Sequence, residues 1–307
     1  MFRPNIRAAG LLAAGLAALA PALAFAQNPS PNPGCRLPTS PSEVAQIINN
    51  CTAQINGANL PPSALSEAYT SRGVAYGDSG DMARASSDFS DAVRIDPHNV
   101  TALANRGAAY AATGDLGRAL TDLNEAVRLS PGNPDAYNTR GLIYAQRGDL
   151  PHALTDFEMA LRGDPNNPGA LANRGNVYAA QGNDTRAISD FSAALRLDPN
   201  MDITRENRAM AYTRKGAYAQ GLADADEVIR RNPRNASAYE SRAQIHALAG
   251  EPAKAVDDFT LAIGLDPRDA NAYWGRGKAY KTLGDAQKAD ADAATAVRLD
   301  PSLAGHP

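Results

Sequence analysis

Residues 141–165 read GLIYAQRGDLPHALTDFEMALRGDP, and this pattern predicts the architecture of most of the chain. Its internal glycine and its final proline both recur every 34 residues, with no insertion or deletion. The glycines stand 17 residues before the prolines and are usually followed by aspartate. Because glycine and proline interrupt helices, each unit has a turn in its middle and a stop at its end. The recurring positions are Gly80, Gly114, Gly148, Gly182, Gly216, Gly250 and Gly284, and Pro97, Pro131, Pro165, Pro199, Pro233, Pro267 and Pro301.

Between these marks the apolar residues follow helical spacing, as in Leu123, Ala126, Val127 and Leu129. Each unit therefore predicts two helices of about a dozen residues. Apolar residues make up 44% of the chain but aromatic residues only 6%, so much of the interior is alanine, the best helix former. Small residues recur in both helices, which predicts close contact between them: Gly73, Gly107, Gly141 and Gly175 in the first, and Ala85, Ala119, Ala153 and Ala187 in the second.

The 34-residue period and the order of these residues resemble the tetratricopeptide repeat family. One unit shows the pattern in full: Gly141, Tyr144, Gly148, Ala153, Phe157, Ala160 and Pro165. The resemblance implies an all-α fold, a right-handed α-solenoid superhelix whose first helices line a concave face that binds peptides or protein segments. Seven units are expected, over residues 66–99, 100–133, 134–167, 168–201, 202–235, 236–269 and 270–303.

Some units depart from this pattern. The fifth has Ala209, Gly221, Ala225 and Val228 where most other units have, in that order, glycine, alanine, an apolar ring or leucine, and alanine. The sixth has His246 in place of tyrosine, and the seventh has Ala293 in place of phenylalanine. Because the fifth unit lacks large side chains that fill the interior of the other units, we expect the solenoid to be packed most loosely there.

Charged residues form two further columns. Each arginine lies eight residues before its turn glycine and each aspartate eight after it, so an antiparallel hairpin places them level. We predict a structural ladder of bidentate ion pairs, although a strip that binds a charged ligand is the alternative. Reversing one charge, by Arg174→Glu, is expected to lower stability. The pairs are Arg72 and Asp88, Arg106 and Asp122, Arg140 and Asp156, Arg174 and Asp190, Arg208 and Asp224, Arg242 and Asp258, and Arg276 and Asp292.

The concave face is expected to carry small and polar side chains, followed by Glu206, Glu240 and Trp274. Several asparagines there resemble the asparagine ladder of the tetratricopeptide domain of the O-linked N-acetylglucosamine transferase. Such amides could bind a peptide backbone, but a solvated helix face explains the row as well. Trp274 is either an interface anchor or a residue packed between the last two units. The candidate partner-binding residues are Asn105, Asn138, Asn173, Asn176, Asn207 and Trp274.

The N-terminal residues predict export. Residues 1–26 carry two arginines, an Ala/Leu-rich run and a small-x-small triplet, which is typical of a cleaved signal peptide; an uncleaved anchor is the alternative. Residues 27–41 predict an extended linker, and residues 42–65 a capping helix with its connection. Cys35 and Cys51 predict a disulfide in an oxidising compartment, as against two free thiols or half of a metal site.

Removing Arg3 and Arg7 leaves 28 basic against 33 acidic residues, a net charge of −5, which argues against nucleic acid or an anionic membrane as a partner. The four histidines have no metal-ligand spacing, and no nucleotide loop or nucleophile motif is present. We therefore expect no cofactor, no metal and no enzyme activity. The expected function is a periplasmic or secreted scaffold that binds a protein segment, and the alternative is self-association through the C-terminal end.

Overall fold

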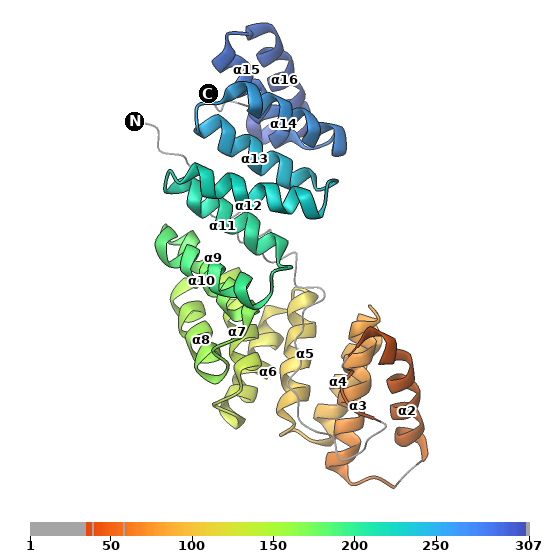
Figure 1. Cartoon of the computed structure of the whole chain (residues 1–307). Helices are drawn as coiled ribbons and strands as arrows, with labels where there is room; N and C mark the ends of the chain where they lie inside the picture. Colours follow the sequence, from red (N-terminus) through yellow and green to blue (C-terminus); the bar gives the residue numbers. More distant parts are fainter. Residues whose placement is uncertain (1–34, 39, 58, 305–307) are drawn as a thin grey trace. The chain divides into compact units, whose positions relative to one another are not determined.

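The computed structural model describes residues 35–38, 40–57 and 59–304, and it is helical throughout that part of the chain, without a strand (Figure 1). The helices follow one another as antiparallel hairpins, so the chain is an α-solenoid of the expected class. Two compact units divide at Val177, within α9. No helix among the described residues is both long enough and apolar enough to span a bilayer.

Unit 1, up to Val177, consists of a short N-terminal segment followed by three complete hairpins and most of α9. Its elements are η2 (Pro41–Glu43), α2 (Val44–Gly57), α3 (Pro62–Asp78), α4 (Met82–Ile95), α5 (Val100–Ala112), α6 (Leu116–Leu129), α7 (Pro134–Gln146), α8 (Leu150–Gly163) and α9 (Pro168–Ala180). The first helix of the first hairpin, α3, starts at Pro62, four residues before the predicted start of the first unit at residue 66. Proline suits the first turn of a helix.

Unit 2, from Tyr178 onward, begins with the end of α9 and contains α10 and three complete hairpins. Its further elements are α10 (Asp184–Leu197), α11 (Asp202–Arg214), α12 (Tyr218–Arg231), α13 (Ala236–Leu248), α14 (Pro252–Leu265), α15 (Ala270–Leu283), α16 (Ala286–Leu299) and η3 (Pro301–Leu303).

The turn glycines are required by the backbone. In the described residues positive φ occurs only at the seven recurring glycines, with values between 74° and 84°. A side chain would be strained in this left-handed conformation, which ends the first helix. In most units the following residue then caps the second helix; the Asp115 side chain, for example, accepts a hydrogen bond from the Arg118 backbone N–H.

The small-residue column allows the two helices of a hairpin to touch. A Cβ added at Gly141 would lie 2.8 Å from Phe157 Cε1, which is too close for two carbon atoms. Phe157 is fully buried with Ala145, Ala153 and Val177. The small residue therefore makes room for the aromatic ring that fills the hairpin.

The fifth hairpin, α11–α12, lacks several stabilising features of the others. Neither Met201 nor Ala217, which precede its two helices, makes a side-chain capping bond. Arg205 occupies the position of Tyr69, Tyr137 and Tyr239, and it is only 8% exposed. Its Nη2 donates to the Pro199 carbonyl at 2.9 Å, but its Nη1 is buried and has no hydrogen-bond partner. Glu227 acts electrostatically with Arg205 but is itself paired with Arg230, so the guanidinium has no ion pair of its own. A buried charge of this kind is costly, so these features favour the expected weakness.

Replacing Arg205 with tyrosine is expected to stabilise the protein by about 1–2 kcal/mol, because the buried charge is replaced by a ring that this position accommodates in other units. Urea unfolding followed by circular dichroism measures the change. The control is Arg196→Tyr on the exposed face of α10, which should leave stability unchanged. A loss of stability in Arg205→Tyr would show that the guanidinium contributes favourably.

The predicted N-terminal segment is described only in part. The signal-peptide residues and most of the predicted linker, up to residue 34, lie outside the described residues. Cys35 and Cys51 form a disulfide with an S–S distance of 2.04 Å, and both are buried against Ala68 and Ala75 of α3. The bond fastens the segment at Cys35 to α2, which packs on α3.

Candidate partner-binding face

The charged columns form bidentate ion pairs inside the hairpins. Arg140 Nε and Nη2 donate to the two carboxylate oxygens of Asp156, at 2.8 and 2.7 Å. The same geometry is present at Arg72 with Asp88, Arg106 with Asp122, Arg208 with Asp224, Arg242 with Asp258, and Arg276 with Asp292. Arg174 and Asp190 also have interaction partners. All seven aspartates are buried, so these pairs belong to the interior of the hairpins.

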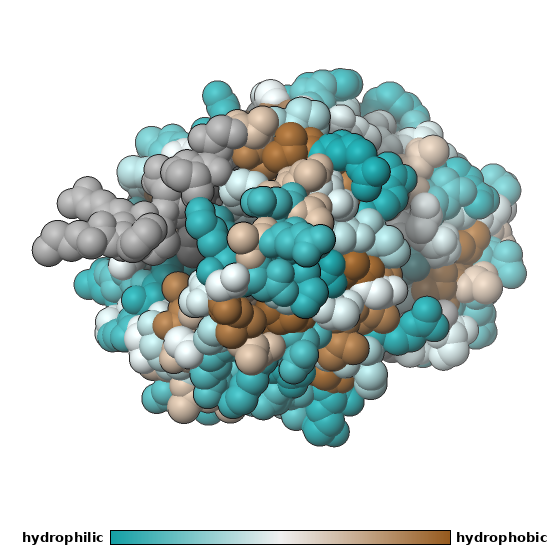
Figure 2. Space-filling view, turned by 90° about the horizontal axis from the view of Figure 1, so that it is seen from above, coloured by the Kyte–Doolittle hydropathy of each residue, from teal (hydrophilic) through white to brown (hydrophobic). Residues whose placement is uncertain are grey.

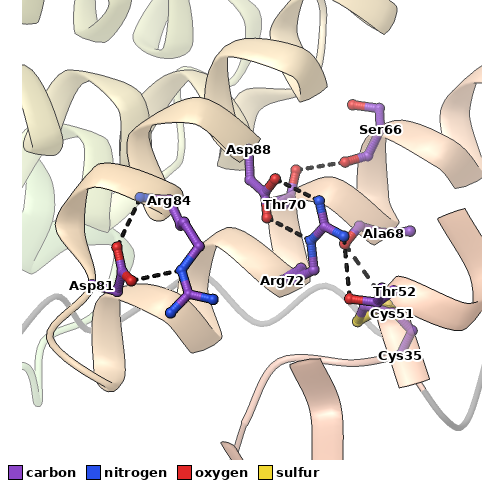
Figure 3. Close-up of polar contacts among 10 residues, drawn as sticks. All are labelled: Cys35, Cys51, Thr52, Ser66, Ala68, Thr70, Arg72, Asp81, Arg84 and Asp88. Carbon is purple, nitrogen blue, oxygen red and sulfur yellow. Dashed lines mark hydrogen bonds and ion pairs between the residues drawn. A yellow bond between two sulfur atoms is a disulfide. The ribbon is translucent and has the colours of Figure 1, made fainter. Parts of the chain in front are cut away.

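Several of these arginines also join neighbouring hairpins. Arg140 Nη1 donates to Asn124 of the preceding α6 at 2.8 Å, and Arg242 Nη1 to Asp226 of α12 at 2.7 Å. Arg72 has no preceding hairpin, and its Nη1 donates instead to Thr52 of α2 at 3.2 Å (Figure 3). The capping helix thus supplies the contact that a preceding second helix supplies elsewhere. These contacts favour a structural ladder over a ligand-binding strip.

The candidate asparagines differ from one another in exposure. Asn105 is 6% exposed and Asn207 is 7% exposed, so neither amide lies openly on the surface. Asn105 Nδ2 is buried without a hydrogen-bond partner. Asn173 Nδ2 donates to Asn138 Oδ1 at 3.1 Å, and Asn176 has a partner of its own. Asn138 and Asn173 of the predicted row are therefore bonded to each other, and Asn207 also has an interaction partner.

In unit 2, three residues share one position of the repeat on the first helices α11, α13 and α15: Glu206, Glu240 and Trp274. Glu206 accepts hydrogen bonds from Asn235 Nδ2 at 2.9 Å and from Ser237 Oγ at 3.0 Å. Glu240 accepts one from Gln244 Nε2 at 2.8 Å. Each of these side chains is half-buried. We call this set the Glu206–Glu240–Trp274 column.

Burial changes the acidity of these carboxyl groups. Desolvation, followed by the negative charge of Asp269, raises the pKa of Glu240 to about 7. Desolvation also raises the pKa of Glu206. The sequence places both residues on the expected concave face, but it could not show that their charges are desolvated. Among the described residues no cluster of acidic, histidine or cysteine side chains could hold a metal ion.

The raised pKa predicts a pH-dependent penalty to stability. Because the folded-state pKa of Glu240 exceeds its ordinary value, the native state loses stability as pH rises from about 4.5 to 7. Glu240→Gln should therefore melt a few degrees above the unmodified protein at pH 8 and at the same temperature at pH 4. Calorimetry at both pH values tests this, with Glu158→Gln, an exposed side chain of α8, as the control. Equal melting temperatures at pH 8 would contradict the prediction.

The chain is a tetratricopeptide repeat protein. Family models described as tetratricopeptide repeats match residues 70–134, 168–201, 207–270 and 270–303, and a model described as a TPR repeat matches residues 141–182. Proteins of this family are generally non-catalytic scaffolds. None of the curated proteins compared with the chain matches it.

Three solved structures show the similarity of fold. A tetratricopeptide repeat protein from Parabacteroides merdae is 25% identical, with a TM-score of 0.59 over 76% of this chain and 93% of that one. PilW, described as a type IV pilus biogenesis factor, is 21% identical, with a TM-score of 0.61 over 67% of this chain and 94% of that one. YrrB, described as having an unusual peptide-binding site, is 22% identical, with a TM-score of 0.52 over 60% and 95%.

Proposed function

We propose that this protein is an exported, non-catalytic scaffold that binds a segment of another protein on the face formed by its first helices. The observation that carries the proposal is the contact between successive first helices. In unit 1, α3 contacts α5 and α5 contacts α7; in unit 2, α11 contacts α13 and α13 contacts α15. Each series makes one continuous face that an extended segment can follow.

The side chains on this face suit protein binding. Asn138 and Asn173 in unit 1 are half-buried amides, and Trp274 in unit 2 is a half-buried indole. Amides can donate and accept backbone hydrogen bonds, and tryptophan is enriched among residues that dominate binding energy. Export is supported by the leader-like residues 1–26 and by the disulfide, since disulfides persist in oxidising compartments. The periplasm is the favoured compartment, and secretion is the alternative.

Site-specific photo-crosslinking tests the proposal. A photoreactive amino acid replaces Trp274 or Asn173 in the native host, and the trapped proteins are identified by mass spectrometry. The control places it at Asp257, which is exposed on the second helix α14. One dominant protein trapped from the first two positions but not from Asp257 is expected. Equal trapping from all three positions, or none, would reject binding on the first-helix face.

Self-association through the C-terminal end has less support. Asp290 of α16 occupies the position that holds Leu120, Leu154, Leu222 or Val256 in other units, so the last helix carries a charge where most others carry an apolar residue. The face visible in Figure 2 shows hydrophobic residues in several patches, with hydrophilic residues between them. Sedimentation over a range of protein concentrations is expected to show one species. Growth of larger species with concentration would instead favour self-association.

A further inference from the structure

The first-helix face of unit 2 holds negative charge without a matching cation. Glu206, Glu240 and Asp269 lie close enough that Asp269 acts electrostatically on Glu240, and Glu206 does so too. Within the described part of the chain, no lysine or arginine nitrogen lies within 4.0 Å of these three carboxylates, whereas Asp224 and Asp258 in the same unit are each paired with arginine. Glu206 and Glu240 accept their hydrogen bonds from neutral side chains, and Asp269 accepts its own from the backbone N–H groups of the first turn of α15.

Trp274 is the last residue of the Glu206–Glu240–Trp274 column. The ammonium group of Lys278 lies 5.3 Å from the centre of its ring, a cation–π geometry. Lys278 therefore covers one face of the indole, and the half-buried ring keeps part of its apolar surface exposed. The other aromatic residue of this part of α15, Tyr273, instead packs into the hydrophobic cluster of Ala262, Ile263 and Ala272. Trp274 thus places a partly exposed apolar side chain at the end of the acidic column.

The spacing of the column fits an extended chain. Neighbouring packed helices lie about 8–10 Å apart. A segment in the extended polyproline II conformation has three residues per turn and advances about 3.1 Å per residue, so side chains three positions apart lie on the same side, about 9 Å apart. Side chains at every third position of such a segment can therefore meet Glu206, Glu240 and Trp274 in turn.

We propose that unit 2 binds an extended protein segment with lysine or arginine side chains three residues apart, which contact Glu206 and Glu240, and an apolar side chain three residues further on, which packs against Trp274. This inference rests on the proposed function and specifies the chemistry of the partner at that face. The ammonium or guanidinium groups supply the missing counter-charge, and charge-assisted hydrogen bonds to carboxylates are the strong ones. An acidic segment is disfavoured by repulsion from the same residues.

The pKa of Glu240 supports the same conclusion and adds a pH dependence. The groups that act on it are Asp269 and Glu206, both acidic, and the neutral Gln244. A cation bound there favours the ionised carboxylate, so binding should be tighter at pH 8 than at pH 6.

A designed peptide tests the inference with the purified full chain. The probe is a fluorescent ten-residue peptide, Leu-x-x-Lys-x-x-Lys-x-x-Leu with small polar residues at x, which has the required spacing in either chain direction. Two control peptides carry glutamate in place of lysine, or the same residues with the two lysines adjacent. Fluorescence anisotropy measures binding to the protein, to Glu240→Gln and to Trp274→Ala. The matched control is Glu158→Gln, which removes the same charge from an exposed side chain of α8.

We expect the spaced lysine peptide to bind more tightly than either control peptide, and Glu240→Gln to weaken it about tenfold or more while Glu158→Gln leaves it unchanged. Trp274→Ala should also weaken binding. Equal affinity for the glutamate peptide, equal affinity for Glu240→Gln, or no binding of the lysine peptide would overturn the inference. If crosslinking at Trp274 still traps one dominant partner in these cases, the proposed function stands without this partner chemistry. If crosslinking traps none, the proposed function itself fails.

Discussion

Replacing Arg140 with leucine is expected to lower the free energy of unfolding by about 3–5 kcal/mol, the usual cost of leaving one member of a buried ion pair without its partner. The Asp156 side chain is 4% exposed, and it accepts two hydrogen bonds from Arg140. The substitution also removes the bond from Arg140 Nη1 to Asn124, which joins this hairpin to the preceding one. Chemical denaturation gives the magnitude, and hydrogen exchange should show lost protection in α7 and α8.

Two further variants make this result specific to the ion pair. Arg162→Leu removes an exposed arginine from the same hairpin, and it should change stability by less than about 0.5 kcal/mol. The double substitution Arg140→Leu with Asp156→Leu should recover much of the loss, because no buried charge remains unpaired. A melting temperature unchanged by Arg140→Leu, together with lost partner binding, would instead favour the ligand-binding strip.

Replacing Phe157 with alanine is expected to cost about 3–5 kcal/mol, because it removes a fully buried ring and leaves a cavity. The ring fills the space beside Gly141, and Ala145, Ala153 and Val177 surround it. The neighbouring backbone cannot close this space without moving one helix toward the other, which the inter-helix ion pair of Arg140 and Asp156 opposes. Thermal or urea unfolding measures the loss.

The control for Phe157→Ala is Leu283→Ala, since Leu283 is 49% exposed and its removal should be nearly neutral. The fifth unit already has Ala225 at the position of Phe157, and Ile245 from the next hairpin packs beside it. The Phe157→Ala variant has the smaller Val177 at that position of the next hairpin, so the space of the lost ring is not filled in the same way. A loss below about 1 kcal/mol would mean that the third hairpin can collapse around the cavity more completely than its ion pair and glycine packing suggest.

The ladder and the proposed partner-binding residues are different side chains. The ladder pairs lie within hairpins and hold the two helices in register, and neither Glu240 nor Trp274 belongs to a ladder pair. Changes in the ladder should therefore act mainly on stability, whereas changes at Glu240 or Trp274 should act mainly on binding. Measuring stability and peptide affinity for the same variants separates the two effects.

Much of the fold could be predicted because the 34-residue period repeats its local signals seven times. Gly148 predicts a turn by its backbone freedom, and the structure gives it φ of 79°. The equal distances of Arg140 and Asp156 from Gly148 predict that they are level across the hairpin, and they form a bidentate pair there. The earlier start of α3 at Pro62 was not anticipated, since the repeat pattern does not extend to residues before Ser66.

The repeat, the hairpins and the residues that face each other within a hairpin follow from the amino-acid sequence alone, because they depend on spacing along one or two helices. The burial of each polar group instead depends on tertiary packing. It covers the amide of Asn105 and places Thr52 of α2 beside Arg72. It also desolvates Glu240 next to Asp269 of the following helix. Burial and electrostatic coupling depend on neighbouring hairpins, whose packing brings together residues that no local spacing relates.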